Sequence, residues 1–200
     1  AGAVKVFNPG KGRGSGCYVT YKGAHLIVTA AHVFDDANTN WLWIVRGKKK
    51  VKGHPVYFDK GEDIALVATK PLDMVKPTRL NVRTPYPPVG EELTYSGYPG
   101  RHDLLTIRGE VVGYQKIWDE REKVVVHTYG WPGASGSCFF DKRGRMVGVL
   151  VAIPIGRGYV PQLLESMVFA TPIKVLDLDK LDKNLCCLLY TSPSPRDDPL

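Results

Sequence analysis

The chain has 200 residues, of which 44% are hydrophobic and 24% charged, and its formal net charge is +7. A chain of this length and composition buries a core without metal or disulfide staples, which excludes a wholly disordered protein. Its longest apolar runs, such as Val147–Ile155, are far shorter than the ~20 residues that cross a bilayer, so we expect no membrane span.

The chain reads as mostly β, because segments rich in Val, Ile, Tyr and Trp alternate with clusters of Gly, Pro, Asn and Asp. In chain order the expected strands are Cys17–Tyr21, His25–Thr29, Trp41–Arg46, Lys52–Phe58, Ile64–Ala68, Glu92–Tyr98, Thr106–Tyr114, Lys123–Tyr129 and Met146–Ile155. Helical periodicity is confined to Pro172–Asn184, which predicts a short C-terminal amphipathic helix. Many short strands and one helix favour a sandwich or barrel over a doubly wound sheet.

A Pro-rich stretch divides the chain, because the Pro residues between Thr69 and Gly90 remove too many backbone donors for a strand ladder. We therefore predict a first β-unit at 1–68, a linker at 69–91, and a second β-unit with the C-terminal helix at 92–184. Leu185–Leu200 has no periodic pattern and resembles a translated cloning adapter. We expect it to be a non-native or disordered tail and exclude it from the fold.

Three local signals carry residue types that serve nucleophilic catalysis. His32 follows an apolar strand and two small residues, Asp63 stands at the mouth of a second apolar strand, and Ser135 lies in a loop flanked by glycines. A Ser hydroxyl needs a base, and His takes and returns a proton near neutral pH. A buried carboxylate on the other ring nitrogen fixes the tautomer. The signals predict Ser135 as nucleophile, His32 as base and Asp63 as the orienting acid.

Other readings of nearby residues stay open. Asp35, Asp36 and Asp59 compete with Asp63 for the role of orienting acid, because they lie near His32 or Asp63 in the chain. His25, His54, His102 and His127 show no metal-ligand spacing with one another or with Cys, so no metal site is expected. Cys17 and Cys138 read as small buried hydrophobes. The basic run Arg46–Lys52 is typical of a solvated hairpin tip, with a nucleic-acid contact as the alternative.

The segments TAAH, DIAL and GASGS, in that order, resemble the trypsin-like (chymotrypsin-fold) serine proteases. The likeness is greatest to the compact HtrA-type enzymes and to the proteases of RNA-virus polyproteins. Gly14–Cys17 and Phe169–Ile173 also resemble family segments, at an early strand and at the close of the second barrel. The resemblance implies an all-β fold of two six-stranded antiparallel β-barrels, with the active site in the cleft between them.

The resemblance also implies roles for individual residues. His32 and Asp63 would come from the first barrel and Ser135 from the second, and the backbone N–H groups of Gly133 and Ser135 would form the oxyanion hole. A substrate pocket is expected at His127, Trp131, Leu150, Val151 and Ala152, and its apolar lining predicts an uncharged P1 residue. The alternative is an acidic or amide P1 residue that accepts a hydrogen bond from an inward-turned His127. Ala134 stands where zymogen-activated trypsins carry an Asp. The resemblance implies no metal and no cofactor.

The function implied is that of a serine endopeptidase acting on a protein or polyprotein, with viral polyprotein processing as a specific role. The alternatives are an inactive protease-fold module that binds RNA or protein, and an esterase-like hydrolase. No signal peptide opens the chain, and Ala1 is not an initiator Met, so we expect a processed or excised N-terminus. The few cysteines favour a reducing, intracellular compartment, and nothing in the sequence indicates an oligomeric state.

Overall fold

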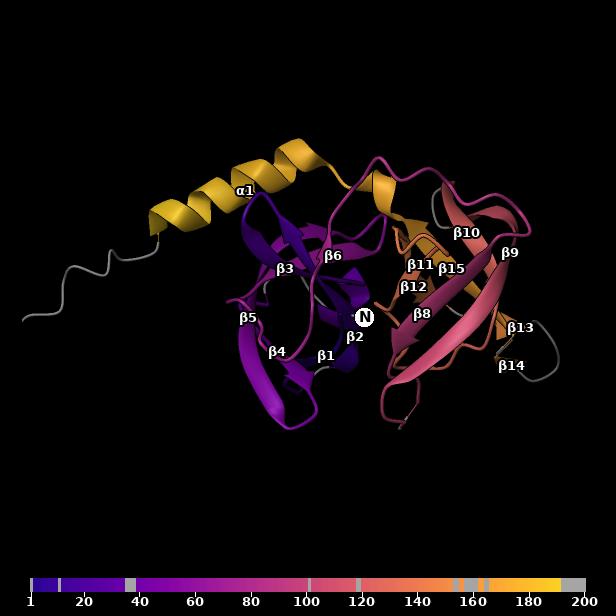
Figure 1. Cartoon of the computed structure of the whole chain (residues 1–200), viewed down its shortest axis with the longest axis horizontal. Coiled ribbons are helices and arrows are strands. Elements are labelled where there is room, and N and C mark those ends of the chain that lie inside the picture. The colour runs from indigo at the N-terminus through magenta and orange to yellow at the C-terminus, as the bar shows by residue number, and fades with distance from the viewer. Residues whose placement is uncertain are drawn as a thin grey trace, which may run out of the picture.

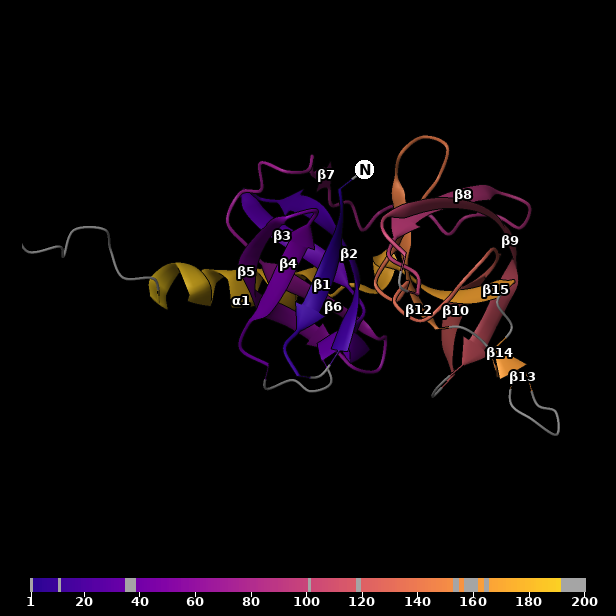
Figure 2. The ribbon, with the colours of Figure 1, turned by 90° about the horizontal axis from the view of Figure 1, so that it is seen from below.

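The computed structural model describes residues 2–10, 12–34, 39–100, 102–117, 120–152, 155–156, 162–163 and 166–191. Two antiparallel β-barrels lie side by side, and a C-terminal helix runs across the first of them (Figures 1 and 2). The expectation of an all-β fold with two six-stranded barrels and one short helix is therefore confirmed. No helix among the described residues has the length and apolar character needed to cross a membrane.

The first barrel is built from the N-terminal third of the chain. Its strands are β1 (Ala3–Asn8), β2 (Gly12–Tyr21), β3 (Ala24–Thr29), β4 (Leu42–Arg46), β5 (Lys49–Asp59) and β6 (Ile64–Ala68). They pair in the order β1-β4-β5-β6-β3-β2, and pairing between β1 and β2 closes the barrel. A two-residue strand, β7 (Thr78–Arg79), adds in parallel to β2. Closure leaves the six strands without an unpaired edge.

The second barrel follows the Pro-rich stretch. Its strands are β8 (Glu92–Gly97), β9 (Leu105–Ile117), β10 (Arg121–His127), β11 (Cys138–Phe140), β12 (Met146–Ala152) and β15 (Met167–Pro172). They close in the order β10-β15-β12-β11-β8-β9. A separate two-stranded ribbon joins β13 (Ile155–Gly156) to β14 (Gln162–Leu163). The active-site loops expected from the sequence lie at the ends of strands in both barrels.

Apolar packing joins the two barrels to each other. The largest core cluster contains residues of the first barrel, such as Val28 and Leu66, together with residues of the second, such as Cys138 and Val149. A smaller cluster around Tyr95 and Phe139 fills the second barrel, where these two rings meet edge to face with centroids 5.2 Å apart. Because one apolar cluster spans both barrels, the interface between them is part of the folded core.

The C-terminal segment differs from the sequence-based expectation. A short 3₁₀ turn, η2 (Ile173–Val175), precedes the helix α1, which occupies Leu178–Thr191 in place of Pro172–Asn184. Pro172 is the last residue of β15, and its backbone is extended. Leu185 and Leu188, which the sequence analysis excluded from the fold, pack against the main core cluster. The helix therefore includes the first part of the excluded tail, and residues 192–200 lie outside the described part of the chain.

Helix α1 is fastened to the first barrel although it follows the second in the chain. The Asp177 backbone N–H donates to the Tyr57 hydroxyl at 3.1 Å, and Asn184 Nδ2 donates to the Val56 carbonyl at 2.7 Å. Leu181, a residue of the helix itself, is completely buried in the main core cluster. After β15 the chain therefore crosses back over the interface between the barrels. Its C-terminal helix packs on the first barrel, which is built from the N-terminal part of the chain.

Candidate active site

His32 lies on a short 3₁₀ turn, η1 (Ala31–Phe34), that begins where strand β3 ends. Ala31, Val33 and Phe34 are buried on this turn, and they anchor it against the core of the first barrel. The His32 side chain points the other way and is 49% exposed. The buried neighbours therefore hold the backbone of the turn in place, while the His32 imidazole faces solvent.

Asp63 lies in the turn between β5 and β6, and its φ of 57° places it in the left-handed region. A non-glycine residue pays about 1–2 kcal/mol for this conformation, so surrounding contacts must hold it there. The residue is only 7% exposed. Its carboxylate is thus removed from water and needs donors to replace the lost hydration.

Those donors come from the turn that carries His32. His32 Nδ1 lies 2.7 Å from Asp63 Oδ2, and the His32 backbone N–H donates to Asp63 Oδ1 at 2.8 Å. The Ala31 backbone N–H donates to the Asp63 carbonyl at 3.2 Å. Because an ionised carboxylate only accepts hydrogen bonds, the side-chain pair requires a proton on Nδ1, and in the neutral imidazole the lone pair of Nε2 is then the acceptor. This is the tautomer that a general base needs.

Of the other three acids considered for this role, the structure describes only Asp59. Asp59 accepts a hydrogen bond from the Glu62 backbone N–H at 2.9 Å, so it stabilises the turn before Asp63. Among the described residues, the acid that pairs with the His32 side chain is Asp63. Asp35 and Asp36 lie outside the described residues. Of the two candidate acids within the described residues, Asp63 is the one that lies against the imidazole.

Ser135 lies in a tight turn at the start of the second barrel's β11. Gly133 and Gly136 adopt φ values of 101° and 89°, which L side chains rarely tolerate. A Cβ on Gly136 would lie 1.9 Å from the Ser15 carbonyl oxygen, so the close approach of the two barrels here requires glycine. The Gly136 N–H donates to the Leu150 carbonyl at 2.7 Å, which fixes the turn to strand β12.

The first barrel holds the Ser135 turn through Ser15, a residue whose role the sequence analysis missed. The Ser15 backbone N–H donates to the Ser135 carbonyl at 2.7 Å. Its hydroxyl donates to the Gly133 carbonyl at 2.9 Å and accepts from the Tyr98 backbone N–H at 2.9 Å. Ser15 is completely buried. The Gly14–Cys17 segment was noted only as a family likeness, and a small hydroxyl between two glycines was the available signal.

The Ser135 turn also lies close to the turn that carries His32. A Cβ on Gly14 would lie 2.7 Å from the Ser135 carbonyl oxygen and 2.6 Å from Val33, the residue after His32. The hydrogen bonds among the described residues include none between Ser135 Oγ and His32, and none donated by the Gly133 or Ser135 backbone N–H. These two amides are the pair that the family resemblance assigned to an oxyanion hole.

The residues expected to form a substrate pocket differ in their exposure to solvent. Leu150 and Val151 are buried in the packed core, while Trp131 and Ala152 are half-buried. His127 is exposed and lines a cavity of about 730 Å³ on the second barrel, together with Tyr129, Arg108 and two glutamates. A smaller cavity of about 190 Å³ borders Gly133. The smaller one adjoins the Ser135 turn, and basic Lys5 and Arg13 lie on its wall.

In the basic run Arg46–Lys52, on the β4–β5 hairpin, two lysine ammonium groups lie over tryptophan rings. Lys50 Nζ lies 4.5 Å from the centroid of Trp43, and Lys52 Nζ lies 4.6 Å from that of Trp41. Lys49 pairs with Asp73 at 3.0 Å, on the exposed surface. The two tryptophans meet edge to face and are half-buried, so they pack within the hairpin surface.

Burial disfavours Cys17 and Cys138 as competing nucleophiles. All four cysteines are free, and Cys17 and Cys138 are buried. Burial raises the pKa of the Cys138 thiol, and contact with Cys17 raises it further, so the reactive thiolate is disfavoured. Within the described part of the chain, no three His, Cys, Asp or Glu side chains gather as metal ligands would.

Comparison with known proteins places this geometry in a family. A family model described as a trypsin-like peptidase domain matches residues 14–149. The Rv3671c protease from M. tuberculosis in its active form has a TM-score of 0.70 and 19% identity, covering 96% of this chain and 83% of that chain. A serine endoprotease from Yersinia pestis gives 0.70 and 19%, over 91% of this chain and 63% of that one.

A third solved structure, the HtrA-type protease AlgW with a tripeptide, has a TM-score of 0.67 and 16% identity. It covers 87% of this chain and 57% of that chain. At these identities the likeness establishes a shared fold. No functionally curated protein matches the sequence.

Proposed function

The chain belongs to the trypsin-like peptidase domain family, and from that premise we propose that it is a serine endopeptidase with Ser135 as nucleophile. The observation that carries the proposal is the pairing of His32 with the buried Asp63, through both the imidazole and the backbone N–H. An imidazole held in one tautomer, beside a Ser in a glycine-flanked turn, has the parts needed for acyl transfer.

The proposed reaction runs through an acyl-enzyme. Ser135 Oγ attacks the scissile carbonyl carbon while His32 Nε2 takes the hydroxyl proton, and Asp63 stabilises the resulting imidazolium. The backbone N–H groups of Gly133 and Ser135 donate to the oxyanion of the tetrahedral intermediate. His32 then returns the proton to the leaving amine, and water hydrolyses the acyl-enzyme by the same steps. A donor of this kind typically lowers the barrier by about 3–4 kcal/mol.

An activity-based probe tests the nucleophile directly. A fluorophosphonate reacts only with an activated serine, so we expect stoichiometric labelling of the wild type, mapped to Ser135 by peptide mass spectrometry. Ser135→Ala abolishes labelling, and Ser137→Ala is the matched control. Ser137 is completely buried, and its hydroxyl has no hydrogen-bond partner among the described residues. Labelling that persists in Ser135→Ala, or that is absent from the folded wild type, contradicts the proposal.

The same experiment separates the alternatives. An inactive binding module leaves the probe unreacted, whereas an esterase-like hydrolase reacts with it but cleaves small esters and not long peptides. We therefore expect the labelled protein to cleave peptides of ten or so residues in a mixed library, with turnover lost in Ser135→Ala. The family resemblance extends the proposal to a polyprotein as natural substrate, and cleavage of a longer precursor that is lost in Ser135→Ala is the corresponding result.

A further inference from the structure

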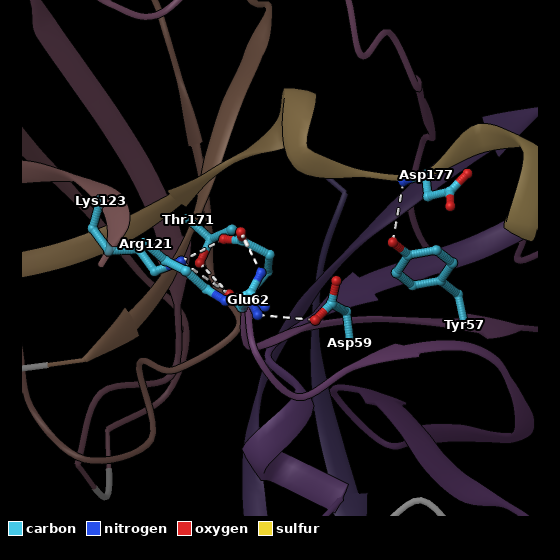
Figure 3. Close-up of polar contacts among 7 residues, drawn as sticks. All are labelled: Tyr57, Asp59, Glu62, Arg121, Lys123, Thr171 and Asp177. Carbon is cyan, nitrogen blue, oxygen red and sulfur yellow. Dashed lines mark hydrogen bonds and ion pairs between the residues drawn. The ribbon is translucent and has the colours of Figure 1, made fainter. Parts of the chain in front are cut away.

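Glu62, the residue immediately before Asp63, is held from the opposite barrel by two cations. Arg121 Nη1 lies 2.8 Å from Glu62 Oε1, and Lys123 Nζ lies 2.7 Å from Glu62 Oε2 (Figure 3). Both cations come from strand β10 of the second barrel, whereas Glu62 belongs to the β5–β6 turn of the first. Each oxygen of the carboxylate therefore has its own charged donor from across the interface.

The backbone of the same residue is held as well. The Thr171 hydroxyl, on strand β15, donates to the Glu62 carbonyl at 2.6 Å, and Lys123 Nζ lies 3.3 Å from that oxygen (Figure 3). Thr171 is completely buried. This carbonyl belongs to the peptide group that joins Glu62 to Asp63, so the second barrel fixes the peptide plane on which the Asp63 conformation depends.

The turn around Glu62 is built to receive these contacts. A Cβ on Gly61 would lie 2.5 Å from the Arg121 guanidinium, so glycine leaves the space that Arg121 occupies. On the other side, Asp59 Oδ1 accepts from the Glu62 N–H at 2.9 Å. Asp63 then adopts its left-handed φ of 57°. A residue in this region needs its neighbours to hold it, and here the neighbours on one side belong to the other barrel.

Fold stability alone gives little reason for such a cluster. The Lys123 side chain is completely removed from solvent, and its partner carboxylate is 15% exposed. Desolvating an ion pair costs about as much as the pairing returns, and well-packed apolar residues stabilise an interface equally well. What charged and hydroxyl donors add is direction, because they fix the orientation of one carboxylate and one carbonyl next to the acid that binds His32.

We propose that Lys123 and Thr171 are positioning residues for Asp63. By holding the carboxylate and carbonyl of Glu62, the second barrel sets the direction in which Asp63 presents its own carboxylate to His32. The inference rests on the proposed function, since it concerns the orienting acid of that site. It also means that each barrel holds the functional turn of the other, because Ser15 of the first barrel anchors the Ser135 turn.

The test uses two substitutions of matched shape in the whole protein. Thr171→Val removes the donor to the Glu62 carbonyl and keeps both ion pairs, and Lys123→Met removes the buried cation at similar length. Displacing a group by about 1 Å costs up to about 100-fold in rate, so we expect kcat to fall about 10- to 100-fold with KM within about twofold. Lys116→Met, which breaks an exposed ion pair with Glu120 on the same hairpin, is the control and leaves kcat unchanged.

A second readout does not depend on turnover. The proton between His32 Nδ1 and Asp63 gives a far-downfield NMR resonance, which we expect to shift or broaden in Thr171→Val and Lys123→Met and to persist in Lys116→Met. Lys123→Arg, which keeps a charged donor, should recover the resonance and most of kcat. Active-site titration with the fluorophosphonate corrects kcat for unfolded protein.

The outcomes separate this inference from the proposed function. If both variants lose thermal stability but keep the resonance and the corrected kcat, the cluster is structural only and the inference is wrong. If the wild type does not react with the fluorophosphonate, the proposed function fails, while the resonance still reports whether Lys123 and Thr171 orient Asp63. Should Lys123→Met not fold, Thr171→Val, which leaves no charge unpaired, decides the question by itself.

Discussion

Asp63 makes two different contacts with His32, and a single substitution separates them. In Asp63→Asn, Oδ1 still accepts from the His32 backbone N–H, so the turn should keep its fold. An amide N–H₂ in place of Oδ2 cannot accept from Nδ1, so the imidazole protonates Nε2 and ceases to be a base. We expect kcat to fall about 10⁴-fold, as reported for this change in a Ser-His-Asp triad.

The measurement is active-site-titrated turnover of a peptide substrate, and Asp59→Asn serves as the control. Its amide oxygen continues to accept from the Glu62 N–H, and the acid that pairs with the His32 side chain among the described residues is Asp63, so turnover should stay within about threefold. A loss below tenfold in Asp63→Asn would assign the orienting role to another acid.

Ser15 and Ser137 allow a prediction about hydrogen bonding, because both are completely buried but only the Ser15 hydroxyl has a hydrogen-bond partner among the described residues. Ser15→Ala leaves the Tyr98 N–H without its acceptor and the Gly133 carbonyl without its donor. Unsatisfied buried groups destabilise by about 1–3 kcal/mol each. We expect urea unfolding to show that Ser15→Ala lowers the free energy of unfolding by about 1–3 kcal/mol. Ser137→Ala should change the free energy of unfolding by less than about 0.5 kcal/mol. Equal losses in the two variants would contradict this.

The Asp141 carboxylate stabilises the turn between β11 and β12 through three hydrogen bonds. It accepts from the backbone N–H groups of Arg143 and Arg145 at 2.9 Å and from Arg145 Nε at 2.7 Å. Burial acts to raise the pKa of Asp141, but the Arg145 and Arg143 hydrogen bonds outweigh it, so the pKa lies below its usual 3.8. The folded state therefore binds the proton less readily than the unfolded chain, and the contribution to stability is present above about pH 4.

Asp141→Asn should thus cost about 1–3 kcal/mol at neutral pH, because charge-assisted bonds are lost. The difference from wild type should shrink as the pH falls from about 4 through the lowered pKa, since the wild-type carboxylate then becomes protonated as well. Thermal unfolding of both proteins between pH 2 and pH 7 measures it, with the exposed Glu110→Gln as control. A difference that is constant over this range would show that the charge plays no part.

At the level of elements, the sequence predicts best where burial is strong on both faces of a strand. Ile64–Ala68 was located to the residue, because an uninterrupted apolar run has no alternative in a β-rich chain. Strand β11 is three residues long and follows directly on the Ser135 turn, so no periodicity distinguished it. The helix was placed too early because Ile173 is periodic with the helix, although its buried side chain belongs to a separate 3₁₀ turn.

Across the whole molecule, the order of the His, Asp and Ser segments was enough to predict the pairing of His32 with Asp63, because each segment carries a local chemical reason. The contacts that hold these segments could not be predicted in the same way. Lys123 lies in a strand that begins Arg-Glu-Lys, which is typical of a solvated face, yet it is completely buried against Glu62. Its partner is fixed only when two barrels from distant parts of the chain pack together.

The N-terminal strand bears on how the Ser135 turn is held in place. In trypsin-type zymogens, as the family resemblance implies, a newly cut amine binds a carboxylate just before the catalytic Ser. Here that position is Ala134, which is completely buried in the core of the second barrel. A buried ammonium without a carboxylate partner is costly, so nothing at this position would stabilise it.

The first residues of the chain are also hydrogen-bonded within the first barrel. The Gly2 carbonyl accepts from the Tyr18 N–H at 2.8 Å, and Ala3 opens strand β1, which pairs with β2 and β4 of the first barrel. The Ser135 turn is held instead by Ser15 and Leu150.

We therefore expect the protein to be active whether or not the amine before β1 is free. The measurement compares the chain beginning at Ala1 with one that carries several additional residues upstream, both titrated with the fluorophosphonate. Equal labelling rates are the expected result, and labelling restricted to the shorter chain would show that a free N-terminus is needed to form the site.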